Sequence, residues 1–125
     1  MSKPAAPRRV GDKEALAVGT TIRGSAQKLN LVAALIRGKT AEEAMNILAF
    51  STKAMAVDAR KVLASAIANA ENNHNLDVDA LVVAEASVGK SMVMKRFHTR
   101  GRGKSTRILK SISRLRIVVR ESEEA

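Results

Sequence analysis

Lysine and arginine side chains are concentrated in one part of the 125-residue chain. Residues 86–120 contain eleven of them and no Asp or Glu, whereas the other ninety residues contain eleven basic and twelve acidic side chains. The formal net charge of +10 therefore arises in this C-terminal segment. So many like charges repel one another unless an array of negative charge neutralises them, and a phosphate backbone is the commonest such array. The pattern predicts a nucleic-acid-binding segment attached to a nearly neutral body.

Two fragments of this segment resemble the end of a phosphate-binding loop, Gly89-Lys90-Ser91 and Gly103-Lys104-Ser105. A Walker loop requires another glycine five residues before the one that precedes its lysine, and those positions hold Ala84 and His98. Neither fragment reads as a turn from a strand into a helix. A phosphoryl-transfer enzyme using Lys104 is therefore a disfavoured alternative, and no carboxylate pair or Ser, His and Asp arrangement predicts another catalytic site.

Metal, redox and membrane functions find little support in the composition. The chain has no Cys, which excludes disulfides and thiolate metal sites and favours a reducing compartment such as the cytoplasm. His74 and His98 stand alone, so we expect solvated or RNA-facing side chains, no metal site and no cofactor. The longest apolar run, 31–36, is too short to span a bilayer, and the first fourteen residues lack the apolar region of a secretory signal.

The scarcity of aromatic residues discriminates among nucleic-acid binders. Only Phe50 and Phe97 are present, whereas modules that grip single strands stack bases on several rings. Phosphate contacts with a folded RNA surface fit better, with Gly101 and Gly103 allowing close backbone approach. The alternative for the charge run is a solvated surface loop.

Hydrophobic periodicity and helix-capping residues predict the elements of the body. The first two are a strand over 15–23 and a helix over 26–37, which Ser25 caps and Gly38 ends. A second helix runs from a capping box of Thr40 and Glu43 to about Phe50. A long third helix is capped by Ser51 or Thr52, has a buried stripe from Met55 to Ala70, and ends at Asn72, Asn73 and Asn75. These elements are expected to form one domain.

Alternating residues near 82–88 and 115–119 predict two half-buried strands joined as one long hairpin. On the first strand we expect Val82, Ala84, Ala86 and Val88 to share a face, and on the second we expect Leu115, Ile117 and Val119 to oppose arginines. The predicted organisation is a flexible leader 1–14, a domain 15–120 with the extended hairpin 82–119 and a tip at about 94–106, and an acidic tail 121–125.

The distal half of this hairpin cannot bury itself, because a lone two-stranded ribbon is marginal in water. Ordering it costs about 1 to 2 kcal/mol of backbone entropy per residue, so an outside partner must offset that cost. Met92 and Met94, near Phe97, are either ordinary ribbon packing or a lining that adapts to varied apolar partners. The cations identify a polyanion as the partner; they are Lys90, Lys95, Arg96, Arg100, Arg102, Lys104, Arg107 and Lys110.

Several motifs resemble those of one known family. They are Ser25-Ala26-Gln27-Lys28, the run 35–39 (Leu-Ile-Arg-Gly-Lys), the run 65–72 (Ser-Ala-Ile-Ala-Asn-Ala-Glu-Asn), Met94-Lys95-Arg96, the run 100–104 (Arg-Gly-Arg-Gly-Lys) and Arg107-Ile108-Leu109-Lys110. In order and spacing, about residues 20–120 resemble the bacterial large-subunit ribosomal protein family number twenty-two.

The resemblance implies an α+β fold, in which three helices pack on a small three-stranded antiparallel sheet. It also implies a structural constituent of the large ribosomal subunit in the cytoplasm. Its body would lie near the exit of the nascent-chain tunnel, and its hairpin would line the tunnel wall opposite ribosomal protein number four. Other implied partners are large-subunit ribosomal RNA, neighbouring ribosomal proteins and the nascent chain, with an early role in assembly. A free-standing nucleic-acid-binding regulator is the alternative from the residues alone.

Two sets of site residues follow for this chain. The expected RNA-binding residues are Arg23, Lys28, Lys90, Lys95, Arg96, Arg100, Arg102, Lys104, Arg107, Lys110, Arg114 and Arg116. The tunnel-lining tip that the resemblance implies comprises Met94, Lys95, Arg96, Arg100, Gly101, Arg102 and Gly103. No catalytic residue and no metal ligand is expected.

Overall fold

The protein is described by a computed structural model that covers residues 13–122. Its elements are β1 (Glu14–Arg23), α1 (Ala26–Ile36), α2 (Ala41–Phe50), α3 (Met55–His74), the 3₁₀ turn η1 (Val78–Ala80), β2 (Leu81–Thr99) and β3 (Ser105–Glu121). The predicted α+β class, with three helices and a three-stranded antiparallel sheet, is confirmed. The predicted leader and acidic tail fall largely outside the described residues.

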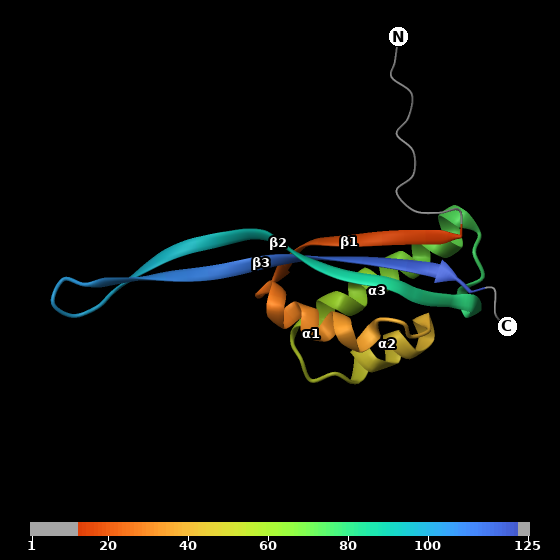
Figure 1. The fold of residues 1–125 in the computed structure, drawn as a ribbon, viewed down its shortest axis with the longest axis horizontal. Helices are drawn as coiled ribbons and strands as arrows, with labels where there is room; N and C mark the ends of the chain where they lie inside the picture. Colours follow the sequence, from red (N-terminus) through yellow and green to blue (C-terminus); the bar gives the residue numbers. More distant parts are fainter. Residues whose placement is uncertain (1–12, 123–125) are drawn as a thin grey trace, which may run out of the picture.

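The sheet has the order β1-β3-β2, so β3 is its central strand (Figure 1). β1 pairs with β3 only as far as Arg23 opposite Ile112, whereas β2 pairs with β3 out to Thr99 opposite Ser105. Beyond Ile112 the sheet therefore narrows to a two-stranded ribbon, which protrudes from the body. The seven residue pairs beyond this point, at about 3.3 Å each, together with the turn give it a reach of about 25 Å past the end of β1.

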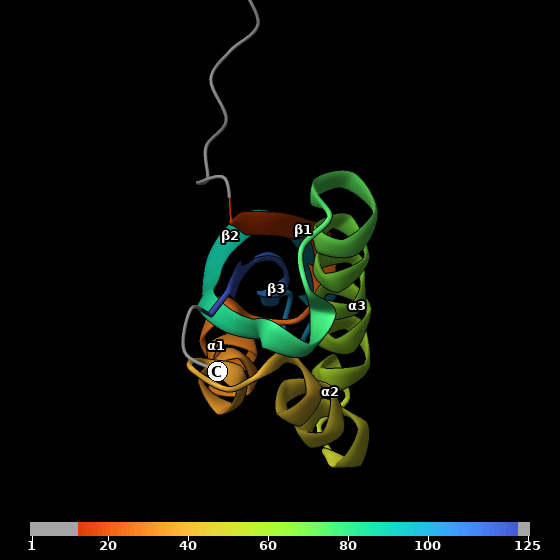
Figure 2. The same ribbon diagram turned by 90° about the vertical axis from the view of Figure 1, so that its right-hand side faces the viewer.

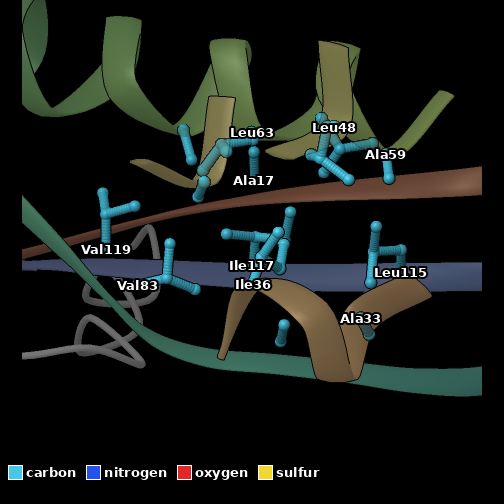
Figure 3. Packing of buried hydrophobic residues seen from close by; sticks show 14 of the residues in the cluster. Ala17, Ala33, Ile36, Leu48, Ala59, Leu63, Val83, Leu115, Ile117 and Val119 are labelled. Atoms are coloured by element: carbon cyan, nitrogen blue, oxygen red, sulfur yellow. The ribbon is translucent and has the colours of Figure 1, made fainter. Parts of the chain in front are cut away.

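The helices cover one face of the sheet, with α3 along β1 and α1 against β2 (Figure 2). The central strand shows the predicted alternation: Leu115, Ile117 and Val119 are fully buried, whereas Arg114 and Arg120 are exposed. Helix residues such as Ala33, Ile36, Ala59 and Leu63 meet these side chains in the core (Figure 3). The many alanines allow the helix backbones to approach the sheet closely without any aromatic ring in the core.

The predicted caps of the first two helices are confirmed. The Ser25 hydroxyl accepts a hydrogen bond from the Lys28 N–H at 3.3 Å, and the Thr40 hydroxyl accepts one from the Glu43 N–H at 3.2 Å. Each bond satisfies one of the N–H groups that a helix start leaves without a partner. Gly38 has φ +76°, the left-handed conformation expected after the C-terminus of α1.

Three predicted helix ends were wrong. α1 stops at Ile36, so Arg37 adopts an extended conformation beyond the helix. The α3 N-cap is Ala54, without a side-chain cap, because the Ser51 hydroxyl bonds to the Lys53 N–H at 3.3 Å within the turn before it. Asn75, with φ 54°, ends α3 alone, since Asn72 and Asn73 lie inside the helix.

The predicted common face of Val82, Ala84 and Ala86 on β2 was also wrong. Val83 and Ala86 are buried, whereas Ala84 is exposed. The pairing with β3 shifts by one residue between Val83 and Glu85. Such a bulge places one extra residue on its strand and reverses the alternation of side chains beyond it.

Leu63 provides a test of the core because it is fully buried on α3. Leu63→Ala should lower the free energy of unfolding by about 2 to 5 kcal/mol through lost burial and the cavity left behind. The measurement is urea unfolding followed by circular dichroism. Leu31 is 56% exposed on α1, so Leu31→Ala is the matched control and should change stability by no more than about 0.5 kcal/mol. Equal losses would contradict the core described above.

Candidate nucleic-acid interface

The ribbon beyond the body, residues 90–110, is called here the arm. Every residue in it is exposed except Met94, which is half-buried. Its exposed apolar side chains include Phe97, with 76% of its surface accessible, and Leu109, with 54%. No helix or third strand covers the arm among the described residues, so its side chains are free to contact a partner on both faces.

The turn at the end of the arm is shorter than the predicted tip of about 94–106. Strand pairing continues to Thr99 and Ser105, and the Arg100 N–H donates to the Lys104 carbonyl at 2.6 Å across the turn. Arg102 and Gly103 both have positive φ, 61° and 71°. This turn carries three of the expected cations within five residues, whereas the expected tip residues 94–96 lie inside β2.

Cations and apolar residues alternate around the arm. Directly opposite residues of an antiparallel pair share a face, and neighbours along a strand point to opposite faces. One face carries Met94 opposite Lys110 and Arg96 opposite Ile108, and the other carries Lys95 opposite Leu109 and Phe97 opposite Arg107. Each face therefore offers positive charge together with apolar surface, a combination suited to a partner that encloses the arm.

A buried serine fixes the root of the arm to the body. Ser113 is the one buried polar residue among residues 13–122, and its hydroxyl donates to the Gly24 carbonyl at 2.7 Å. The Gly24 N–H donates to the Ser111 carbonyl at 3.0 Å. At Gly24, φ is +141°, a backbone conformation that residues with a side chain rarely adopt, so a substitution there is strained. We did not predict this contact from the sequence. Ser113 lies two residues before Leu115, so the alternation along β3 already places it on the buried face.

The loop between α1 and α2 covers the outer edge of β2. The Gly38 N–H donates to the Val83 carbonyl at 3.1 Å, and the Val83 N–H donates to the Lys39 carbonyl at 2.8 Å. The Arg37 guanidinium donates through Nε to the Ala86 carbonyl at 2.8 Å and also bonds to Asn30. Arg37 thus ties α1 to β2 just before the strand leaves the body.

The remaining expected RNA-binding residues lie on the body near this root. Arg23 ends β1 opposite Ile112, and Lys28 is exposed on the first turn of α1. Arg114 is exposed on the face of β3 away from the helices, and Arg116 is partly buried there. Arg116 forms an ion pair with Glu85, in which Nη1 lies 3.4 Å from Oε1. The structure therefore places eight of the expected cations on the arm and the other four on the body.

Other kinds of site are not apparent in the described part of the chain. Among residues 13–122, no group of three His, Asp or Glu side chains is arranged to hold a metal ion. No helix in that range is long and apolar enough to cross a membrane. His98 is exposed on the arm, and His74 lies at the C-terminal end of α3.

Comparison with known proteins agrees with this arrangement. A family model described as Ribosomal protein L22p/L17e matches residues 17–120. The chain belongs to this family. It is therefore a structural ribosomal protein and not an enzyme, which removes the phosphoryl-transfer alternative. The resemblance seen in the sequence motifs is confirmed.

Full-length relatives carry the name Large ribosomal subunit protein uL22. The one from Novosphingobium aromaticivorans is 90% identical to this chain, and the match covers 100% of both. The relative from Zymomonas mobilis is 78% identical over 100% of this chain and 99% of its own length. The relative from Rhodopseudomonas palustris is 63% identical over 100% of this chain and 98% of its own length.

The exposed arm leads to a prediction about its backbone. In the isolated protein, amide protons of residues 90–110 should exchange with solvent much faster than those of the buried strands, because the arm lacks a second layer of packing. Hydrogen exchange followed by mass spectrometry measures this directly. Adding RNA should slow exchange in the arm and leave the core near Ile117 unchanged. Strong protection of the arm without RNA would contradict the prediction.

Proposed function

We propose that this chain binds large-subunit ribosomal RNA through its arm and the adjoining root, mainly by phosphate contacts. As a member of its family, the chain is a component of the large ribosomal subunit in the bacterial cytoplasm. The observation that best supports RNA binding is an exposed ribbon that carries eight cations without an acidic residue. A phosphate backbone supplies the counter-charge that such a ribbon needs.

The energetics of the arm support the same proposal. Its strands are ordered at a backbone cost of about 1 to 2 kcal/mol per residue, less what strand pairing restricts. Its exposed apolar side chains contribute almost no burial in the free protein. RNA that encloses both faces supplies charge neutralisation and burial together. Binding and ordering of the arm are therefore coupled in this proposal.

We further propose that the arm lines the nascent-polypeptide exit tunnel and that binding supports early assembly of the subunit. The predicted tip residues, Met94 to Arg96 and Arg100 to Gly103, would face the tunnel, with ribosomal protein number four and the nascent chain as neighbours. A slender arm that reaches about 25 Å from a compact body suits insertion between RNA segments. The alternative from the residues alone, a free-standing RNA-binding regulator, is not supported, because the chain belongs to a family of ribosomal proteins.

Salt dependence tests the phosphate contacts. If six to ten phosphates are neutralised, the logarithm of the binding constant should fall against the logarithm of salt concentration with a slope of about −5 to −9. The measurement is equilibrium binding of the full chain to protein-free large-subunit ribosomal RNA at salt concentrations from about 50 to 300 mM. A slope near zero would reject the electrostatic mechanism.

A photo-crosslinking residue at Arg102 tests the tunnel proposal. Ribosomes that carry the label and a stalled nascent chain should give a crosslink between the turn and the nascent chain, because the turn is the farthest point of the arm. The same label at Lys53, which is exposed between α2 and α3, is the control and should give none. Crosslinks from the control alone, or from neither position, would reject tunnel lining.

A further inference from the structure

A basic notch lies where β2 and β3 leave the body. It has a volume of about 240 Å³ and is lined by Ser87, Val88, Gly89, Lys90, Arg114 and Arg116. Gly89 lies directly opposite Arg114, and Ser87 lies directly opposite Arg116. Because Gly89 has no side chain, the notch is open between the two arginines.

We propose that this notch binds one backbone phosphate of the RNA. The bound phosphate would fix the position of the body along the RNA strand that the arm contacts. This inference rests on the proposed function and adds a defined subsite to it. Within residues 13–122, no carboxylate pairs with Lys90 or Arg114, so their charges are available to an anion. Arg114 shares the face of the notch with Gly89, and a guanidinium and a phosphate form charge-assisted bonds that are stronger than neutral ones.

The edge of β2 adds backbone donors to the notch. β2 is an edge strand, and the loop after α1 covers this edge only as far as Ala86, whose carbonyl accepts from Arg37. Pairing with β3 is regular from Glu85 to Lys90, so backbone groups point to the same edge at every second residue. The N–H groups of Val88 and Lys90 therefore face the same open edge as the Ala86 carbonyl. An anion at this edge would meet N–H donors beside the cationic side chains.

Glu85 limits the notch on the side of the body. Its carboxylate holds Arg116 at 3.4 Å, and it is the last acidic residue before the basic segment. The ion pair keeps the Arg116 side chain along the sheet, as one wall of the notch. A phosphate placed closer to the body than this wall would meet the Glu85 carboxylate, and like charges repel.

Gly89→Leu tests the notch without changing any charge. A Cβ at Gly89 would lie 3.7 Å from the nearest atom, Arg114 Cγ, so the strand accommodates a side chain there. The added leucine fills the notch and should exclude the phosphate. We expect the salt slope for binding to large-subunit ribosomal RNA to become shallower by about 1, the change for one lost phosphate contact.

Two further variants make the test specific. Ala84→Leu adds the same side chain at an exposed position of the same strand outside the notch, and should leave the slope unchanged. Arg114→Gln removes a cation from the notch and should also make the slope shallower by about 1. Combining Gly89→Leu with Arg114→Gln should give a change of about 1 and not 2, because both remove the same phosphate. Unfolding midpoints confirm that each variant folds.

The outcomes separate this inference from the proposed function. Arg107→Gln, on the distal arm, reports on the arm alone. If Gly89→Leu behaves like Ala84→Leu while Arg107→Gln makes the slope shallower, the notch holds no phosphate and arm binding stands. If the salt slope of the double variant becomes shallower by about 2, Gly89 and Arg114 act on different phosphate contacts, and binding of one phosphate by both is rejected. If Arg107→Gln also has no effect, RNA binding by the arm is rejected as well.

Discussion

The structure depends on one constraint: a two-stranded ribbon of like charges has to be held away from its body without a second layer of packing. The arm has no acidic residue and, apart from Met94, no residue that escapes solvent. Neither burial nor internal ion pairing can therefore hold its shape. What remains inside the chain is the ladder of backbone hydrogen bonds between β2 and β3 and the way these strands are fixed at the root.

The body meets this constraint by making the arm and the core from the same strand. β3 is central in the sheet, and its Leu115, Ile117 and Val119 are packed beneath the helices while its residues 105–110 extend into the arm. The hydrogen bond from Ser113 to Gly24 and the bond from Arg37 to Ala86 fix both neighbours of that strand at the root. Movement of the arm at its base would therefore disturb buried, satisfied polar groups, which is costly.

Much of this fold follows from patterns that are local in the sequence. The alternation at 115–119 and the caps at Ser25 and Thr40 each rest on neighbours within a few residues, and each prediction was correct. The faces of β2 were not predictable in this way. Residues 81–84 are all apolar, so hydrophobicity gives no sign of the bulge that exposes Ala84 and buries Val83. Only the register with β3 decides which of them is buried.

The candidate site also has one part that local sequence predicts and one part that only the strand register determines. Composition identifies the cations of the arm, because an excess of charge needs no knowledge of neighbours. The notch, in contrast, depends on the register that sets Gly89 opposite Arg114, twenty-five positions later in the chain. The contact of Ser113 with Gly24 likewise joins residues 89 positions apart. Such pairings follow from the folded sheet and cannot be derived from spacing alone.

The hairpin also converts the uneven distribution of charge along the sequence into an uneven distribution of charge in space. Because β2 and β3 are antiparallel, the acid-free stretch folds back on itself, and its return strand reaches Glu85 at Arg116. At the opposite end of the sheet, Glu121 accepts a hydrogen bond from the Asp77 N–H at 3.2 Å, next to Asp79 in η1. The arm thus carries no acidic residue, whereas at the far end of the body these acidic residues lie beside the cations Lys13 and Arg120. A polyanion is attracted to the arm, so the charge distribution orients the protein before any specific contact forms.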